Sequence, residues 1–286
     1  MEDVLAQGLL VGGVYALVAL GFVLVFKSSQ VLNLAHGELI AILSYFLYQM
    51  LGVWGLSDWV GILLIIPCGA ILGFLMERLA IRPLLGQPFL SVLMMTLMLS
   101  FLLKGVIVLV WGSDSFTLPF TPSGQWAIGP VNVIPGAAIS FVAAMVIFLL
   151  LTVLFRYTKV GLSMRVVAAD YEVAQSLGIR VKRVFSISWA ISGAFAAICG
   201  VLVGMVFTVT PFMGEVALGK GLPVLLLGGL TSIPGAIVGG LIIGLAEALA
   251  SYYQPGLKEI IPWVVMLVIL LIRPYGLFGE KRIERI

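Results

Sequence analysis

Few side chains in this sequence could carry out metal, acid–base or nucleophilic chemistry. His36 is the only histidine, so paired-histidine metal motifs cannot occur. None of the serines lies in the Gly-x-Ser-x-Gly pattern of a nucleophile elbow. An intramembrane serine hydrolase would need His36 as its base, and retention of function in His36→Ala would remove that alternative.

Asn33, His36, Gly37 and Glu38 lie between the first two apolar stretches of the chain. The connection is short, so it can dip into the bundle as a broken helix, a device by which transporters expose polar groups to a pathway. We predict that these residues help to form an inner gate. The alternative is structural: Asn33 and Glu38 cap a helix start and His36 is hydrogen-bonded inside the protein.

Lys104 and Glu247 are the charges placed farthest inside apolar runs. A charge at the centre of a spanning helix costs about 2.5 to 3.5 kcal/mol on insertion scales unless it is paired or hydrated. An ion pair between the two helices is one expectation, and contact of each side chain with the outer surface is the other. A proton or ion relay is less well supported, because one pair gives no chain of titrating groups.

The stretch GEVALGK at 214–220 has the spacing of a phosphate-binding loop. The next residue is Gly221, where that motif has Ser or Thr to hold magnesium. We therefore predict no ATP site, no catalytic residue and no bound metal or cofactor in this chain. Cys68 and Cys199 both lie in apolar runs, where small core side chains are more plausible than a disulfide.

The composition places most of the chain in lipid. Of its 286 residues, 62% are hydrophobic and 10% are charged, with a formal net charge of +3. Soluble domains average about half apolar and about a quarter charged residues. The apolar excess must therefore face lipid, which excludes a cytosolic enzyme, a nucleic-acid-binding protein and a disulfide-rich secreted domain.

Nine charge-poor apolar stretches reach or approach the length of a membrane-spanning helix, about 20 residues. They lie at 4–26, 39–54, 60–76, 89–110, 134–155, 184–209, 216–230, 234–252 and 257–272. Two of them, 216–230 and 257–272, are short enough to be broken or re-entrant pieces. We predict an all-α polytopic membrane helical bundle that is one domain over 1–286, with about eight or nine spanning segments. Recurrent Gly-x-x-x-Gly pairs predict close helix packing within it.

The distribution of Lys and Arg predicts the orientation. If the N-terminus is outside, thirteen of the sixteen basic residues fall in the inner loops and tail, where cytoplasmic loops retain them. The C-terminal tail, 273–286, is then cytoplasmic. The first apolar stretch begins with Glu2 and Asp3 rather than a basic region, so we expect a retained helix and not a cleaved signal.

Residues 156–183 form the largest polar island, with six basic residues against Asp170 and Glu172. The middle of this segment is rich in helix-favouring residues. Asp170 can cap a helix start, and Gly178 suits its end. The segment therefore predicts one or two short amphipathic helices in a cytoplasmic loop.

Two interpretations of this loop remain open. In the functional one it docks a cytoplasmic partner, and Val173, Ala174 and Leu177 form part of the apolar contact. In the other, the helix lies on anionic lipid, which basic flanks favour.

Five stretches resemble a known family of transport proteins. The segment 161–179 resembles the Gly-containing loop by which permeases of ATP-binding-cassette importers engage their ATPases. The others resemble the branched-chain amino acid permease family, and the short N-terminal region is most like its smaller, H-type subunit. They are VLNLAHGE at 31–38, ERLAIRPL at 77–84, LGGLTSIPGA at 227–236 and RPYGLFG at 273–279.

The resemblance implies a subunit that moves branched-chain or related hydrophobic amino acids across a bacterial or archaeal cytoplasmic (inner) membrane. It implies four kinds of partner: a paralogous permease or a second copy, two cytoplasmic ATPases that use ATP and Mg, an external or periplasmic binding protein, and membrane lipid. The ATPase-coupling residues would be Gly161, Arg165, Asp170, Glu172, Val173, Ala174, Leu177 and Gly178.

Several alternatives stay open beside this expectation. The family includes members for urea and short amides, so the cargo is not fixed by the resemblance. An ion-coupled secondary transporter is the alternative from another class, and uptake by this chain without any ATPase would favour it. A channel is a third, recognised by conductance without ATP.

Overall fold

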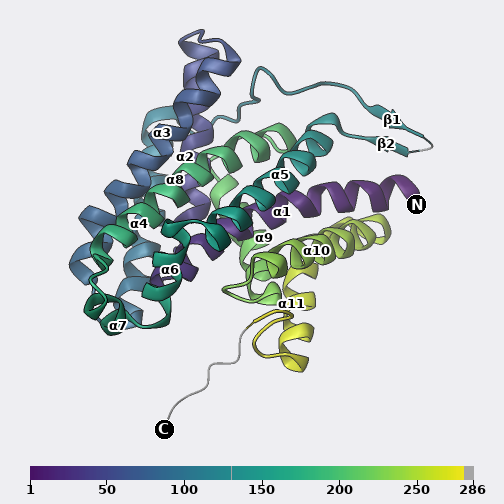
Figure 1. Cartoon of the computed structure of the whole chain (residues 1–286). Helices are drawn as coiled ribbons and strands as arrows, with labels where there is room; N and C mark the ends of the chain where they lie inside the picture. Colours follow the sequence, from purple (N-terminus) through teal and green to yellow (C-terminus); the bar gives the residue numbers. More distant parts are fainter. Residues whose placement is uncertain (130, 280–286) are drawn as a thin grey trace.

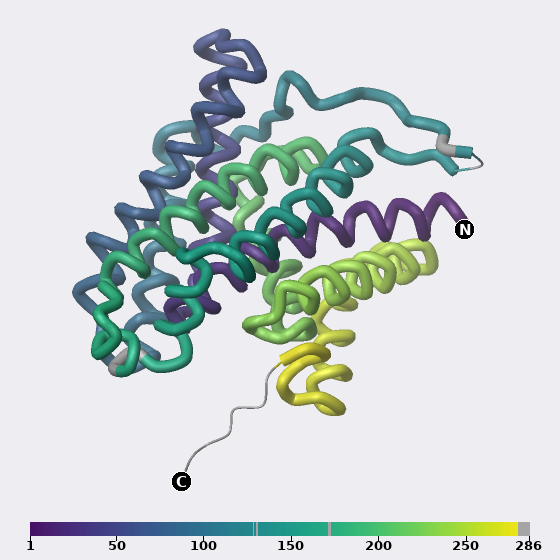
Figure 2. Tube along the Cα trace, viewed as in Figure 1, coloured from purple at the N-terminus to yellow at the C-terminus, as the bar shows by residue number. Residues whose placement is uncertain are grey.

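The computed structural model describes residues 1–129 and 131–279, apart from the side chains of residues 128, 171 and 172. Within this range the chain forms a bundle of helices and one short β-hairpin (Figures 1 and 2). The prediction of an all-α membrane bundle is confirmed. The hairpin joins β1 (Trp126–Ile128) to β2 (Val131–Val133) and was not foreseen, because it lies in a polar connection between two apolar stretches.

Six helical spans in the described part of the chain are long and apolar enough to cross a membrane. They are α1 (Glu2–Ser29), α3 (Asp58–Met76) with the turns η2 (Glu77–Ile81) and η3 (Arg82–Leu84) that continue it, α4 (Phe89–Trp111), α5 (Pro135–Tyr157), α8 (Val181–Val206) and α10 (Ile233–Tyr253).

Three shorter helices account for the remaining apolar stretches. They are α2 (His36–Tyr48), which the π-helical turn η1 (Gln49–Val53) extends, α9 (Met213–Gly228) and α11 (Ile261–Ile272), which follows the turn η4 (Pro255–Leu257). The expectation that 216–230 and 257–272 are short is confirmed, and α2 is a third short helix. Two further helices, α6 (Lys159–Ala169) and α7 (Tyr171–Ser176), join α5 to α8, as the composition of 156–183 predicts.

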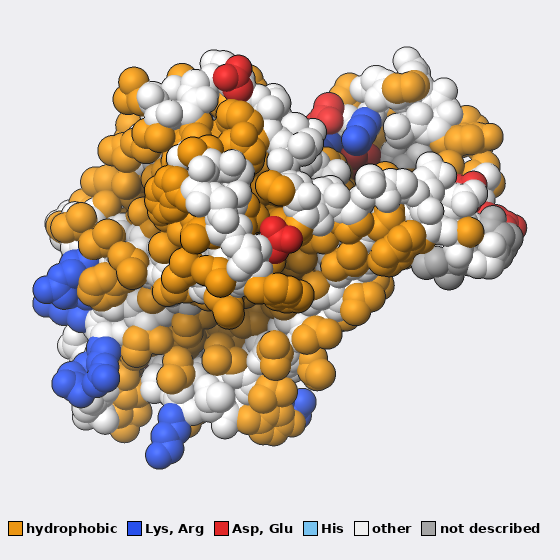
Figure 3. Space-filling view, turned by 90° about the horizontal axis from the view of Figure 1, so that it is seen from above, with side chains coloured by type: hydrophobic (Ala, Val, Ile, Leu, Met, Phe, Trp, Pro, Cys, Tyr) orange, Lys and Arg blue, Asp and Glu red, His pale blue; other side chains and the backbone are white. Residues whose placement is uncertain are grey.

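The centre of the bundle is α1, which packs against α10, α8, α9 and α5. This helix is apolar on all sides, as a helix enclosed by others must be. By contrast, α3, α4 and α5 lie at the periphery and expose large side chains such as Leu63, Leu109 and Leu149. Figure 3 shows a surface that is mainly hydrophobic, which fits contact with lipid.

Glycines bring the central helices into backbone contact. A Cβ added at Gly12 would lie 2.7 Å from the carbonyl oxygen of Gly240, and one added at Gly240 would lie 2.6 Å from the Cβ of Ala16. The pair formed by α3 and α8 is equally close, because Gly73 faces the backbone of Trp189 and Gly193. The predicted role of the Gly-x-x-x-Gly pairs in close packing is confirmed for these helices.

One end of the bundle, which we call the basic end, holds the last turns of α1, α3 and α5, the first turn of α8 and the segment after α11. The ammonium of Lys27 lies 5.4 Å from the ring centroid of Phe155, and Arg82 donates to Ser186. The N-terminus lies at the opposite end, where Asp3 accepts a 2.8 Å hydrogen bond from the backbone of Asn132 in β2 of the hairpin (Figure 1).

Candidate functional site

The connection between α1 and α2 turns back into the bundle. Gln30 adopts the left-handed conformation, with φ of 56°, directly after α1. The imidazole of His36 then packs against Gly21, two turns before the end of α1, and 5.0 Å from the ring centroid of Phe22. The helix is therefore broken as the sequence predicts, and α2 starts inside the protein.

Side chains hold this connection in place. The hydroxyl of Thr96 in α4 lies 3.1 Å from the carbonyl oxygen of Leu32 and accepts a 3.3 Å hydrogen bond from the backbone of Leu34. Asn33 accepts a 3.2 Å hydrogen bond from the backbone of Ala35, which stabilises the turn that leads into α2. Asn33 therefore stabilises the turn before α2, whereas the N-cap position itself is Ala35 and has no side-chain cap.

The connection between α8 and α9 is a second break that leads into the start of a short helix. Val209 and Phe116 exchange two backbone hydrogen bonds of 2.9 Å, which tie this connection to the strand-like segment after α4. The chain then enters α9 at Met213. The stretch at 214–220 that has the spacing of a phosphate-binding loop is accordingly the start of a helix.

The first turns of α2 and α9 meet. A Cβ on Gly37 would collide with the carbonyl group of Gly214, and a Cβ on Gly214 would collide with the carboxylate of Glu38. Only glycine at both positions allows this approach. The carboxylate of Glu38 therefore lies at the N-terminal ends of two helices, which carry partial positive charge. We call Asn33, His36, Gly37, Glu38 and Gly214 the junction.

The junction contains buried polar atoms that have no hydrogen-bond partner among the described residues. They are Nδ2 of Asn33, both ring nitrogens of His36 and Oε2 of Glu38. The three residues are at most 2% exposed. Buried polar atoms without partners are costly and uncommon in folded proteins. The junction therefore has hydrogen-bonding capacity that water, a solute or another arrangement of the helices could use.

A large cavity opens on the basic-end side of the junction. Its volume is about 1020 Å³. Its wall includes Gln30 and Leu32 from the broken connection and Ala168 and Ala169 from the end of α6. The α1–α2 connection and the end of α6 therefore line the same cavity.

The two intramembrane charges do not pair with each other, so the ion pair considered for Lys104 and Glu247 is wrong. Lys104 forms an ion pair with Glu215 in the first turn of α9. Glu247 lies 3.3 Å from the ammonium of Lys220 and 3.7 Å from that of Lys258. The physical reason is helix arrangement, because α10 packs against α1 and α9.

The predicted caps of the α6–α7 segment are present. Asp170 accepts a 2.9 Å hydrogen bond from the backbone of Val173, and Gly178, with φ of 78°, follows the end of α7. Thr158, which sequence reasoning missed, caps α6 by accepting a 3.1 Å hydrogen bond from the backbone of Gly161. A Cβ on Gly161 would meet the last turn of α5, so that glycine permits the sharp bend between the two helices.

The surface of α7 differs from the expected apolar contact at one position. Val173 and Leu177 are 50% and 67% exposed, but Ala174 is completely buried. Ala174 is buried because α7 packs against α6 and α8. Arg165 is exposed, whereas the side chain of Glu172 lies outside the described residues. A partner can thus reach Val173 and Leu177, while Ala174 serves the fold.

Besides Thr158, three residues named above escaped the sequence analysis. Thr96 and Glu215 have no signal in the sequence, because their partners lie more than sixty positions away. Gly214 had a signal, since it lies beside an acidic residue at the start of an apolar run. The spacing of these residues was closer to that of a phosphate-binding loop than to the pattern of a helix start. Of the tail at 273–286, the part from 280 onward lies outside the described residues.

Comparison with known proteins gives a consistent family. A family model described as the permease component of branched-chain amino acid transport systems matches residues 4–270. The high-affinity branched-chain amino acid permease LivH of Escherichia coli K12 is 32% identical over 98% of this chain and 96% of its own length. The corresponding protein BraD of Pseudomonas aeruginosa is 30% identical over 99% and 97%.

A solved structure shows the same fold at low sequence identity. PsaBC from Streptococcus pneumoniae, in complex with a Fab, aligns with a TM-score of 0.50 and 12% identity, covering 97% of this chain and 93% of that one. The overall architecture is thus shared with a chain of very different sequence.

Proposed function

The chain belongs to the permease family of branched-chain amino acid transport systems, and from this premise we propose that it is a membrane subunit of an ATP-driven importer of branched-chain or related hydrophobic amino acids. The observation that carries the proposal is the match over 4–270, together with relatives that align along nearly their whole length. Because the similarity covers every spanning helix, it extends over the whole membrane-spanning part of the chain.

The proposed complex contains three further kinds of protein. A paralogous permease or a second copy completes the membrane unit, two ATPases bind at the basic end, and a binding protein delivers the amino acid at the opposite end. We place the basic end in the cytoplasm because cytoplasmic loops retain Lys and Arg. The protein then lies in the inner membrane of a bacterium or archaeon, with its N-terminus outside.

In the proposed mechanism, the ATPases act on the α6–α7 segment, and α6 carries the motion inward. Ala168 and Ala169 at the end of α6 share a cavity wall with Leu32 of the broken connection. A displacement of α6 therefore changes the walls that support the junction. There the α2–α9 contact depends on Gly37 and Gly214, and its opening would give the solute a route into the cavity of about 1020 Å³.

The direct test is reconstitution of this chain in proteoliposomes with its paralogous permease, two ATPases and the binding protein. We expect leucine uptake that requires ATP and stops when the ATPases are left out. Uptake driven by a proton or sodium gradient through the permease alone would contradict the proposal. Transport of urea or acetamide in preference to leucine would leave the ATP-driven importer in place and change its cargo.

The junction makes a separate prediction about the inner gate. Glu38→Gln removes a negative charge from the ends of two helices, where such a charge contributes about 0.3 to 1 kcal/mol at each end. We expect ATP-driven uptake to fall by about fivefold to tenfold, with the complex still assembled. His36→Ala empties the space against Gly21 and should act in the same direction. Both are measured as uptake per ATP hydrolysed.

Asp58→Asn provides a matched control for the junction variants. Like Glu38, Asp58 lies in the first turn of a helix, here α3, but it is not part of the junction. Its replacement should leave uptake within about twofold of the unmodified protein. Normal uptake and normal coupled ATP turnover in both Glu38→Gln and His36→Ala would show that the junction is only structural.

A further inference from the structure

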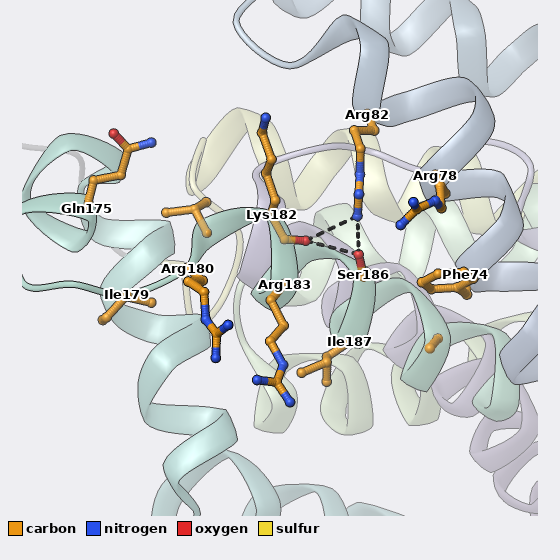
Figure 4. A pocket seen from close by; sticks show the side chains of 12 residues that line it. Phe74, Arg78, Arg82, Gln175, Ile179, Arg180, Lys182, Arg183, Ser186 and Ile187 are labelled. Atoms are coloured by element: carbon orange, nitrogen blue, oxygen red, sulfur yellow. Dashed lines mark hydrogen bonds between the residues drawn. The ribbon is translucent and has the colours of Figure 1, made fainter.

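A second pocket at the basic end is lined by basic side chains. It has a volume of about 710 Å³ and lies between the end of α3 and the start of α8 (Figure 4). Arg78 and Arg82 reach it from the α3 side, and Arg180, Lys182 and Arg183 come from the α8 side. None of the residues that line it is acidic. Five cations therefore border one pocket in a chain whose formal net charge is only +3.

One of these five cations is fixed by a buried acid. Arg82 donates hydrogen bonds of 3.1 and 3.0 Å to the carboxylate of Glu77, which is completely buried. Ser186 donates a 2.9 Å hydrogen bond to the same carboxylate. Arg82 thus joins the end of α3 to α8 and forms a rigid edge of the pocket.

The other four cations have no acidic partner among the ion pairs of the described residues. The guanidinium of Arg78 lies 5.9 Å from the ring centroid of Phe74. Like charges gathered at one place repel each other unless an anion lies between them. The pocket therefore fits a ligand that carries at least one phosphate or a comparable negative charge.

An apolar stripe leads away from the pocket along α3 and the turn η2 that continues it. Ile71, Leu75 and Leu79 follow one another at intervals of four residues and are 58%, 40% and 72% exposed. This spacing places them on one face of the helix, next to Arg78 and Phe74, which line the pocket. A free phosphate would use only the cations, whereas a phospholipid would use the cations and the stripe together.

We propose that this pocket binds the phosphate headgroup of an anionic phospholipid, whose acyl chains lie along Ile71, Leu75 and Leu79. Basic pockets between spanning helices at a membrane surface bind such headgroups. Because Gln175 and Ile179 also line the pocket, the bound lipid would brace the end of the α6–α7 segment against α3. This binding site is independent of what the protein transports.

The test measures lipid binding to the purified full chain in detergent by native mass spectrometry. Phosphatidylglycerol and cardiolipin should bind, and phosphatidylcholine should bind much more weakly. Each Lys or Arg near an anionic membrane surface adds to the free energy of binding acidic lipid. Arg180→Gln combined with Arg183→Gln should therefore weaken phosphatidylglycerol binding by about thirty-fold. Equal binding of phosphatidylcholine, or unchanged affinity in the double variant, would overturn the proposal.

The matched control combines Arg156→Gln with Arg273→Gln. Both residues are exposed cations at the basic end, and neither lines the pocket, so phosphatidylglycerol affinity should change by less than about threefold. Thermal unfolding of both double variants checks that each is folded.

Two further arms identify the source of the anion. Inorganic phosphate that displaces phosphatidylglycerol at equal concentration would assign the pocket to a free anion and overturn the lipid proposal. So would a pocket variant that keeps its lipid but no longer assembles with an ATPase, because the cations would then serve protein docking.

Discussion

Replacing Leu177 by aspartate should reduce ATP-driven uptake by more than tenfold and leave the permease folded. Val173 in the six-residue helix α7 and Leu177 directly after it are large apolar side chains, 50% and 67% exposed, outside the spanning bundle. Substitutions at exposed positions usually change folding stability by no more than about 0.5 kcal/mol. Burying an unpaired carboxylate against a partner protein costs several kcal/mol. We therefore expect the loss to appear in coupling rather than in folding.

The measurement compares uptake and substrate-stimulated ATP hydrolysis in the assembled complex. Val173→Asp should behave like Leu177→Asp. Ser176→Asp adds the same charge to the same helix, but at an exposed polar position, and should retain most of the uptake. If all three variants transport normally, α7 does not contact the ATPases.

The α6–α7 segment shows which structural features could be predicted from the sequence and which could not. Asp170 and Gly178 were predictable, because a cap and a left-handed turn residue act on their own backbone. The burial of Ala174 was not, since it depends on what α7 packs against. The ends of a short helix can therefore be predicted from the sequence, whereas the face that it buries depends on its neighbours in the fold.

The same limit applies to the bundle. The spanning helices follow from the length of apolar runs, and the glycine pairs predict that some helices approach closely. Which helices do so is a tertiary property: Gly12 faces Gly240, more than two hundred positions away. The error over Lys104 and Glu247 has the same origin, because an unpaired charge in an apolar run indicates only that a partner exists.

Two broken connections place the first turns of α2 and α9 against each other inside the bundle. Helices that start inside a protein leave their first N–H groups free to meet a solute or an anion. In this chain α2 and α9 both start there, and Glu38 occupies the space between them. Their connections are held by Thr96 and by the backbone of Phe116, so in the proposed mechanism the contact between the helices is the part that opens.

Breaking the buried charge network around Glu247 should destabilise the protein by about 3 to 5 kcal/mol, because removing one partner leaves an uncompensated buried charge. Lys220 and Glu247 are 3% and 4% exposed. The Lys220 ammonium lies 3.0 Å from Glu259 and donates a 3.1 Å hydrogen bond to the backbone of Lys258. The hydroxyl of Tyr15 donates a 3.0 Å hydrogen bond to Glu247. The network thereby joins α1, α9 and α10 to the turn before α11.

Lys220→Met and Glu247→Gln, alone and together, measure this network through the free energy of unfolding in mixed micelles. The double variant should lose less than the sum of the single losses, with a coupling of about 1 to 3 kcal/mol, because the second substitution removes a charge that the first has already isolated. Lys104→Met is the matched control for this experiment.

The ion pair of Lys104 with Glu215 is partly exposed, with side chains 24% and 57% accessible, so its loss should cost no more than about 1 kcal/mol. Lys104→Met should also add to Glu247→Gln without coupling, since each residue has its own partner. Additive losses for Lys220→Met and Glu247→Gln, to within about 0.5 kcal/mol, would mean that the two charges are solvated separately and that α9 and α10 are held together by packing alone.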